Sequence, residues 1–353
     1  MLKKINGIEI SGISCCVPKH KIFNKDIKNS KKISKNKDIA KKRIIKAIGI
    51  DSRPVADADT CTSDLVLKSA NHILKKLNWK RQEIDVLVFV SQTADYLTPA
   101  TSGILQDKLK LKKSTLVFDI NLGCSGYTHG LIAISSLMKS LNLKKGLLAV
   151  GDVLTKLVHK DDDISNLLFG DGVSVTAIKN NKDNNKNLYC SYYSDGSGYN
   201  DIIVPSHSLS GRNKLTRDQI KNKKDIKNNT RSNINIYMDG PNVFNFGIND
   251  VMPLLKKINK KFRDIKYCFL HQANKMIQDS IAKQLNDKKI IFPSSLKNYG
   301  NTSGASIPMT ICHNYHHKKL NGYSLLCGFG VGLSISAAVI NLEKTKIFKP
   351  IKL

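Results

Sequence analysis

The sequence predicts an α/β protein built from two similar parts. Short runs of Val, Ile and Leu alternate with longer segments in which apolar residues recur at the helical spacing. Apolar runs of this kind are typical of strands in a sheet that is covered by helices on both faces. A polar run at residues 180–187 divides the chain, and the alternation resumes after it. We therefore expect two α/β halves, residues 1–180 and 181–353.

In the first half, periodicity and apolar runs predict five strands and three helices. The strands are expected at residues 7–17, 85–90, 115–120, 147–150 and 172–178, and the helices at residues 62–77, 99–109 and 127–141. Residues 19–46 are dense in Lys, Asn and Ser, so we expect a mobile or weakly helical surface segment there.

The second half repeats this pattern. Helices are expected at residues 242–262, 273–285 and 302–317, and strands at residues 267–270, 323–327 and 333–340. Residues 206–233 form a long polar stretch without an apolar period. A segment of that length in a compact domain is usually a lid or a disordered insertion.

Composition narrows the class of protein. The chain has 353 residues, of which 41% are hydrophobic, so it has enough apolar surface for a sizeable core and is not mainly disordered. No apolar run approaches the roughly 18 residues that cross a bilayer, and the residues after Met1 do not include the apolar stretch of a secretory leader. We therefore expect a cytoplasmic protein with no membrane insertion.

The formal net charge of +29 comes from 57 basic and 28 acidic residues, and only seven of the basic residues are Arg. Proteins that read nucleic-acid bases depend on the bidentate contacts of Arg, so this excess of Lys predicts no nucleic-acid partner. A solvated Lys surface is the simpler interpretation. The alternative is an acidic protein partner, because a positive field speeds association with anions.

The eight cysteines form no C-x-x-C pair and fit no zinc or disulfide framework, so we expect reduced thiols and no metal site. Cys124 lies between a predicted strand and a predicted helix, with Gly123 and Gly126 beside it. A helix N-terminus favours the thiolate, which is the nucleophilic form. On this segment alone, a buried structural cysteine is the stronger interpretation.

Two other segments place a polar residue at the end of a buried strand or in a turn. His271 stands in the sequence His-Gln-Ala-Asn, between a strand and a helix. Asn301 stands in the sequence Gly-Asn-Thr-Ser-Gly-Ala-Ser, where Thr302 or Ser303 is expected to cap the next helix. Each segment alone indicates only a satisfied polar residue or a helix cap.

Taken together, Cys124, His271 and Asn301 resemble the Cys-His-Asn set of the β-ketoacyl-ACP synthase III family. The resemblance runs from Ile8 to the C-terminus and includes the turn at residues 169–172 and the glycine loop at residues 328–332. It implies a thiolase-like fold, with two similar α/β halves in a five-layer α-β-α-β-α arrangement. It also implies a homodimer, acyl carrier protein (ACP) as partner, and no cofactor.

The resemblance also assigns roles. An acyl group would be loaded onto Cys124 and condensed with malonyl-ACP as CO2 leaves, while His271 and Asn301 stabilise the enolate oxygen. The acyl oxyanion would be held by the Cys124 amide and by the backbone loop that contains Gly328, Gly330 and Gly332. The helix after His271 would dock the carrier, with Lys275 and Lys283 as the candidate contacts.

Three positions depart from the family pattern. The tryptophan that stacks on the adenine of CoA is missing near Arg43, and Trp79, the only tryptophan, lies elsewhere. Asp163 stands where a second stacking residue would be Arg. Both changes favour an acyl-ACP donor, with a CoA that binds in a different way as the alternative. Thr98 replaces the Phe that closes the acyl pocket, which predicts room for a longer or substituted acyl group.

Several alternatives stay open. Elongating synthases of this fold would carry a second His in place of Asn301. Thiolases would carry a second cysteine, for which Cys327 is the candidate. Hydroxymethylglutaryl synthases would carry a catalytic Glu, but residues 93–95 offer only Asp95. Acyl transfer to an amine or hydroxyl without elongation is one rival function, and a catalytically inactive basic interaction protein is another. The pathway is either fatty-acid initiation or a dedicated acyl supply.

Overall fold

The computed structural model describes residues 2–27, 35–181, 186–206, 215–224 and 230–353. The predicted surface segment at residues 19–46 and the predicted insertion at residues 206–233 therefore lie partly outside the described residues. The described parts of the insertion hold one helical turn, α5 (Arg217–Ile220), and a small two-stranded ribbon of β11 (Lys223–Lys224) and β12 (Thr230–Arg231).

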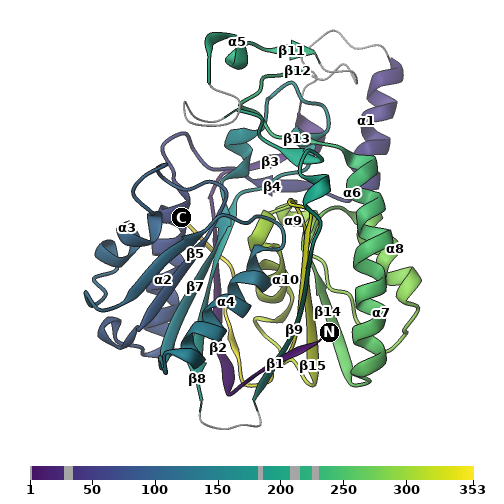
Figure 1. Cartoon of the computed structure of the whole chain (residues 1–353). Helices are drawn as coiled ribbons and strands as arrows, with labels where there is room; N and C mark the ends of the chain where they lie inside the picture. Colours follow the sequence, from purple (N-terminus) through teal and green to yellow (C-terminus); the bar gives the residue numbers. More distant parts are fainter. Residues whose placement is uncertain (1, 28–34, 182–185, 207–214, 225–229) are drawn as a thin grey trace.

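The chain folds into five layers, which confirms the predicted fold class (Figure 1). Helices α2 (Thr62–Leu77) and α3 (Thr101–Lys108) cover the outer face of a seven-stranded sheet. Helices α4 (Gly126–Ser140) and α10 (Ser306–Tyr315) form the central layer. A five-stranded sheet follows, and α7 (Met252–Lys261) and α8 (Lys275–Leu285) cover its outer face.

The seven-stranded sheet has a parallel centre at which β5 pairs with β6 and with β7. Its strands, in order from one edge, are β17 (Lys346–Ile347), β2 (Ile8–Val17), β8 (Gly172–Asn180), β7 (Lys145–Asp152), β5 (Val86–Val90) and β6 (Leu116–Ile120), with β18 (Ile351–Lys352) also on β2. Strand β6 is an edge strand, and the helix that follows it, α4, begins in the turn that carries Cys124.

The five-stranded sheet pairs β14 with β15 in parallel and the other strands antiparallel. Its order is β1 (Lys3–Asn6), β9 (Asn187–Ser194), β16 (Ser334–Asn341), β15 (Tyr323–Gly330) and β14 (Ile265–Leu270). The first strand of the chain thus joins the second sheet, while β17 and β18 join the first. The division into two halves at residue 180 stays a prediction, and each end of the chain adds strands to the sheet of the other half.

Some elements differ from their sequence prediction. The helix expected at residues 242–262 consists of α6 (Gly240–Phe246) and α7, joined by a wide π turn at Gly247–Val251. Pro253 has no backbone N–H to donate, which accounts for a local departure from the α-helical ladder. The helix expected at residues 302–317 begins with a 3-10 turn at Ser303–Ala305, and only residues 306–315 form α10.

The remaining elements are short or lie at the top of the view in Figure 1. They are α1 (Lys35–Ile48), the pair β3 (Lys21–Phe23) and β4 (Ser52–Pro54), the pair β10 (Ile202–Ile203) and β13 (Tyr237–Met238), and the single turn α9 (Leu296–Tyr299).

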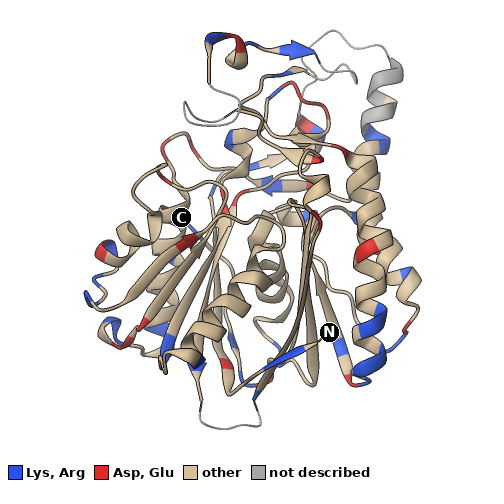
Figure 2. Cartoon of the chain, in the orientation of Figure 1, with Lys and Arg blue, Asp and Glu red and all other residues tan. Residues whose placement is uncertain are grey.

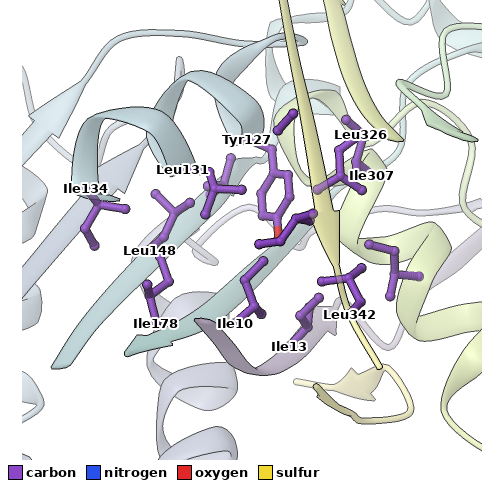
Figure 3. Close-up of a cluster of buried hydrophobic side chains, with 14 of the residues drawn as sticks. Ile10, Ile13, Tyr127, Leu131, Ile134, Leu148, Ile178, Ile307, Leu326 and Leu342 are labelled. Atoms are coloured by element: carbon purple, nitrogen blue, oxygen red, sulfur yellow. The ribbon is translucent and has the colours of Figure 1, made fainter. Parts of the chain in front are cut away.

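The central apolar cluster fixes α4 between the two sheets. Tyr127 on the first turn of α4 is fully buried, and its hydroxyl lies 3.1 Å from the Thr176 Oγ1 atom of β8. Figure 3 shows Tyr127 and Leu131 packed among side chains of both halves, including Ile10 and Leu326. Because this packing holds the first turn of α4, it also sets the position of Cys124.

Basic residues are scattered over the described elements rather than gathered on one face (Figure 2). Among the helices of the described residues, none is both long and apolar enough to cross a membrane.

Candidate active site

The three residues singled out in the sequence line one cavity of about 50 Å³ where the two sheets meet. Cys124 follows β6, His271 follows β14, and Asn301 follows α9. Strands β6 and β14 belong to different sheets, so each half of the fold contributes to the cavity. Most of the other lining residues are apolar, including Leu154, Phe169, Val243, Ile277 and Phe329.

The backbone of β15 approaches Cys124 so closely that only glycine fits. A Cβ atom on Gly330 would lie 2.7 Å from Cys124 Cβ and 3.0 Å from Cys124 Sγ. Gly330 also has a φ of +150°, a conformation that residues with side chains rarely adopt. At Gly328, a Cβ atom would lie 2.9 Å from the Cys124 carbonyl oxygen. The segment predicted as a glycine loop thus continues β15 as far as Gly330, and this end of the strand lies directly against the thiol.

Burial dominates the acidity of the Cys124 thiol. It raises the pKa to about 12, and the buried Asp152 carboxyl raises it further, while the Val331 backbone amide acts in the opposite direction. The sequence led us to expect a lowered pKa from the helix N-terminus, and this expectation is wrong. The partial charge at the start of α4 is a smaller effect than the removal of the thiol from water.

Asp152, at the end of β7, organises the floor of the site. Its Oδ1 atom accepts hydrogen bonds from Ser91 Oγ at 2.9 Å and from the backbone amides of Gln92 and Thr93 at 2.7 and 3.1 Å. Gln92 in turn lines the cavity and packs against Gly123. A Cβ atom on residue 123 would lie 2.0 Å from the Oε1 atom of Gln92. Sequence reasoning missed Asp152 and Gln92, although an Asp that ends a buried strand was a usable signal.

His271 is neutral at physiological pH. It is 1% exposed, and burial lowers its pKa to about 3. Its Nδ1 atom lies 2.7 Å from Ser306 Oγ, which also accepts a hydrogen bond from the Gln272 amide at 3.3 Å. If the Ser306 hydroxyl donates to Nδ1, the ring proton resides on Nε2. The Phe329 ring packs edge-on against the imidazole, with centroids 5.6 Å apart.

The neighbours of His271 hold its backbone in place. The Gln272 side chain donates to the Leu270 carbonyl and accepts from the Ser295 amide at 3.0 Å. Asn274 caps α8, because its Oδ1 atom accepts a hydrogen bond from the Ile277 amide at 2.9 Å. Ser306 was not identified from the sequence, since a serine on a helix carries no signal of its own.

The Asn301 side chain is oriented by a single backbone contact. Its Oδ1 atom accepts a hydrogen bond from the Ser303 amide at 2.9 Å, which leaves Nδ2 as the remaining donor. Its backbone is held by Leu168 and by Gly170, at 2.9 and 3.0 Å. Neither Thr302 nor Ser303 caps α10 through its side chain, so the predicted cap is wrong. The 3-10 turn enters the helix without one.

Glycine at position 170 is required by this packing. A Cβ atom there would lie 2.1 Å from the Tyr299 carbonyl oxygen. The turn at residues 169–172, noted in the sequence, is thus the surface against which the Asn301 loop is held.

Other sequence candidates lie away from the cavity. Thr98 is exposed in the single chain and does not line the cavity. Lys275 and Lys283 are both exposed on α8. Gly332 follows the end of β15, and the loop residue whose amide reaches the Cys124 thiol is Val331, which the sequence did not single out.

A cover closes the cavity from above. Its lining includes Ile202 on β10, Met238 on β13 and Ile236, which directly precedes β13. The cover is held down by a hydrogen bond of 2.8 Å from the Ile236 amide to the Leu157 carbonyl.

Comparison with known proteins gives a consistent result. Residues 118–196 match the family described as 3-oxoacyl-[acyl-carrier-protein (ACP)] synthase III, and residues 255–342 match its C-terminal domain. The chain is 32% identical over 342 residues to a β-ketoacyl-[acyl-carrier-protein] synthase III of Streptococcus mutans, covering 95% of this chain and 99% of the relative. It is 33% identical over 331 residues to the protein of that description from Clostridium tetani, covering 92% and 95%.

A solved structure is also similar. The 3-oxoacyl-(acyl-carrier protein) synthase of Burkholderia xenovorans superposes with a TM-score of 0.88 at 32% identity, and the match covers 100% of this chain and 99% of that one.

The raised pKa of Cys124 predicts how its reactivity depends on pH. Below its pKa, the thiolate fraction rises about tenfold per pH unit. The rate of alkylation of Cys124 by iodoacetamide, followed by intact mass and peptide mapping, should therefore climb steadily from pH 7 to pH 10. A plateau at or below pH 8 would show that the thiol is already ionised and that burial does not control it.

Proposed function

The chain belongs to the 3-oxoacyl-[acyl-carrier-protein] synthase III family, a family of transferases, and we propose that it condenses a Cys124-bound acyl group with malonyl-ACP to give a β-ketoacyl-ACP and CO2. The observation that carries this proposal is the shared cavity. It brings one thiol, one neutral imidazole and one free amide donor to the same small volume.

In the loading step, the Cys124 sulfur attacks the carbonyl carbon of an acyl thioester. The bond to the carrier sulfur breaks, and the thiol proton passes to the departing carrier thiolate. Nε2–H of His271, which lines the same cavity, can donate a hydrogen bond to the sulfur atoms as they gain negative charge. The backbone amides of Cys124 and of the loop from Gly328 to Gly332 are the donors we assign to the carbonyl oxygen as it gains negative charge.

In the condensing step, malonyl-ACP loses CO2, and the electron pair of the broken bond becomes an enolate of the thioester. Nε2–H of His271 and Nδ2–H of Asn301 donate to the enolate oxygen. The enolate carbon then attacks the acyl carbonyl, and the Cys124 sulfur leaves and takes up one proton. The driving force is CO2 release, so the reaction needs no metal ion or redox cofactor.

The neutral state of His271 suits this role. A buried donor that stays uncharged can stabilise a developing oxyanion without the cost of burying a cation in the resting enzyme.

All eight cysteines are free thiols, which fits the reducing cytoplasm that we propose as the compartment.

We also propose a homodimer formed across β6. This edge strand is apolar, and Leu116 on it is 38% exposed. The adjacent loop exposes Leu97 by 77%, and the loop is tied to β6 because Asp119 accepts a hydrogen bond from the Thr101 amide at 2.7 Å. An uncovered apolar edge strand is a template for strand pairing. Because Thr98 is exposed in one chain, its role in an acyl pocket requires a second subunit.

The dimer is tested by charge placed on that edge. Leu97→Glu combined with Leu116→Glu should convert a dimer of about 79 kDa, twice the 39.3 kDa chain mass, into monomer during sedimentation velocity. The matched control, Leu141→Glu, alters a residue that is 54% exposed at the end of α4 and should remain dimeric. A wild-type protein that sediments as a monomer would contradict the proposal.

Removal of one donor should separate the two steps. Asn301→Ala is expected to load acyl groups at a near-normal rate but to release CO2 from malonyl-ACP on the order of 10²–10³ times more slowly, since one preorganised donor is lost. Intact-mass spectrometry measures loading, and release of labelled CO2 measures the second step. Cys124→Ala is the control that cannot load.

Normal CO2 release by the Asn301 variant would contradict the assigned role. Product analysis of the wild-type protein tests the function itself. A β-ketoacyl-ACP supports condensation, whereas an acylated amine or hydroxyl compound would show acyl transfer without elongation.

For the acyl donor, we propose ACP rather than CoA. Arg43 and Asp163 are both exposed. Trp79 does not take the place of the missing stacking residue, because its ring lies beneath Lys145, whose Nζ atom is 4.8 Å from the ring centroid. Arg231 lies beside the three aspartates at residues 161–163, but its guanidinium is already paired with Asp162 at 3.9 Å and lies 4.8 Å from the Tyr237 ring centroid. Lys275 and Lys283 project from α8, which also supplies lining residues of the cavity, so an acidic carrier can dock there.

Loading rates test the choice of donor. Base stacking contributes roughly 1–3 kcal/mol, so loss of both stacking partners should weaken CoA binding by about tenfold or more. The same acyl chain should therefore load faster from ACP, and that rate should fall steeply with salt. Lys283→Glu should slow loading from ACP but not from CoA. Equal rates from both donors, with no salt effect, would refute the proposal.

A further inference from the structure

We propose that a groove between α1 and α8 is a second ligand site, and that it binds the anion of a medium-chain fatty acid. The groove has a volume of about 1000 Å³, at the upper end of the range for small-molecule sites. It is twenty times larger than the closed cavity that holds Cys124. The proposal does not rest on the proposed function, because it concerns binding at different residues.

The floor of the groove is apolar. Strand β14 contributes Cys268 and Leu270, which are buried beneath it. Apolar side chains from α1, α8 and the segment after residue 291 complete the floor, among them Ile45, Ala282, Phe292 and Leu296. A continuous apolar floor of this size favours an aliphatic chain, because each methylene that it removes from water adds to the affinity.

The rim of the groove is positively charged. Five lysines line it, namely Lys25, Lys42, Lys46, Lys275 and Lys297. The two acidic residues of the rim are already paired, Asp51 with Lys297 at 3.6 Å and Asp279 with Lys275. Within the described residues, Lys25, Lys42 and Lys46 form no ion pair. The groove therefore combines an apolar floor with a rim on which three lysines have no ion pair among the described residues, and this is the complement of a fatty-acid anion.

The wall of the groove also holds an unsatisfied donor. Gln278 lines the groove from α8, and its buried Nε2 atom has no hydrogen-bond partner among the described residues. A buried donor without a partner is unfavourable, and a rotation of this side chain would present it to a carboxylate in the groove.

The groove is separate from the reaction cavity. Helix α8 and the end of β14 form the wall between them, with Asn274 and Ile277 facing the cavity and Lys275, Gln278 and Ala282 facing the groove. No residue lines both spaces. A ligand in the groove therefore lies behind the helix that follows His271, not in the path of the acyl substrate.

Binding is tested by calorimetric titration of the full-length protein with octanoate, decanoate and dodecanoate. We expect the affinity to rise roughly tenfold for each two methylenes added. Lys42→Glu combined with Lys46→Glu should weaken dodecanoate binding at least tenfold, and Ala282→Phe, which fills the groove, should do the same. The matched control, Lys318→Glu with Lys319→Glu, carries the same change of charge at exposed positions outside the groove and should bind as the wild type does.

The location is tested with a photoreactive dodecanoate analogue and peptide mapping. Cross-links in the segments at residues 42–49, 275–282 and 292–297 support the proposal. Cross-links confined to Val243, Phe329 and their neighbours would place the ligand in the reaction cavity and overturn it. An affinity that is unchanged by both groove variants, or independent of chain length, would also overturn it, as would the absence of binding.

Discussion

Removal from water is the physical constraint on which this site depends. The same burial that lowers the pKa of His271 to about 3 raises that of the Cys124 thiol to about 12. In the resting enzyme the site is therefore uncharged at these two groups, and no cation has to be held in an apolar cavity. In the reaction that we propose, the hydrogen-bond donors act on a charge that appears only as bonds break, and low polarity makes each donor more effective.

The positions of the donors and of the thiol are set by the backbone around the cavity, which close packing and hydrogen bonds hold in place. Gly330 lets β15 pass within contact distance of Cys124, and Gly170 lets the Asn301 loop lie against a neighbouring turn. Ser306 fixes the His271 ring through a hydrogen bond. Asp152 fixes the loop from Ser91 to Thr93 in the same way. Because these supports come from both halves, the site exists only when the two sheets are packed on the central helices.

Much of the fold follows from local pattern, whereas the errors arise from tertiary effects. Residues 62–77 form the predicted helix because their apolar face is continuous, and β5 is recognisable as a run of buried Val and Leu. Strand β9 was missed, since its Tyr, Ser and Cys residues show no such run. The π turn between α6 and α7 was missed because periodicity continues across it.

The site shows the same division. Cys124, His271 and Asn301 were identified from three motifs and a family resemblance, and the structure brings them to one cavity. The direction of the Cys124 pKa was wrong because a sequence shows the helix N-terminus but not the depth of burial. Ser306 and Val331 act through position alone, so no residue pattern could have distinguished them from ordinary core and loop residues. Asp152 differs, because an Asp at the end of a buried strand was a signal that the sequence offered and that was not used.

The most direct test of this account is the protonation state of His271. Nuclear magnetic resonance of protein labelled with ¹⁵N-histidine, with the His271 signals assigned by their loss in His271→Gln, reports the charge and tautomer of the ring. The account predicts a neutral ring with its proton on Nε2 throughout pH 5 to 8. A titration midpoint near the ordinary histidine value of about 6.5 would show that the cavity is open to water, and would contradict it.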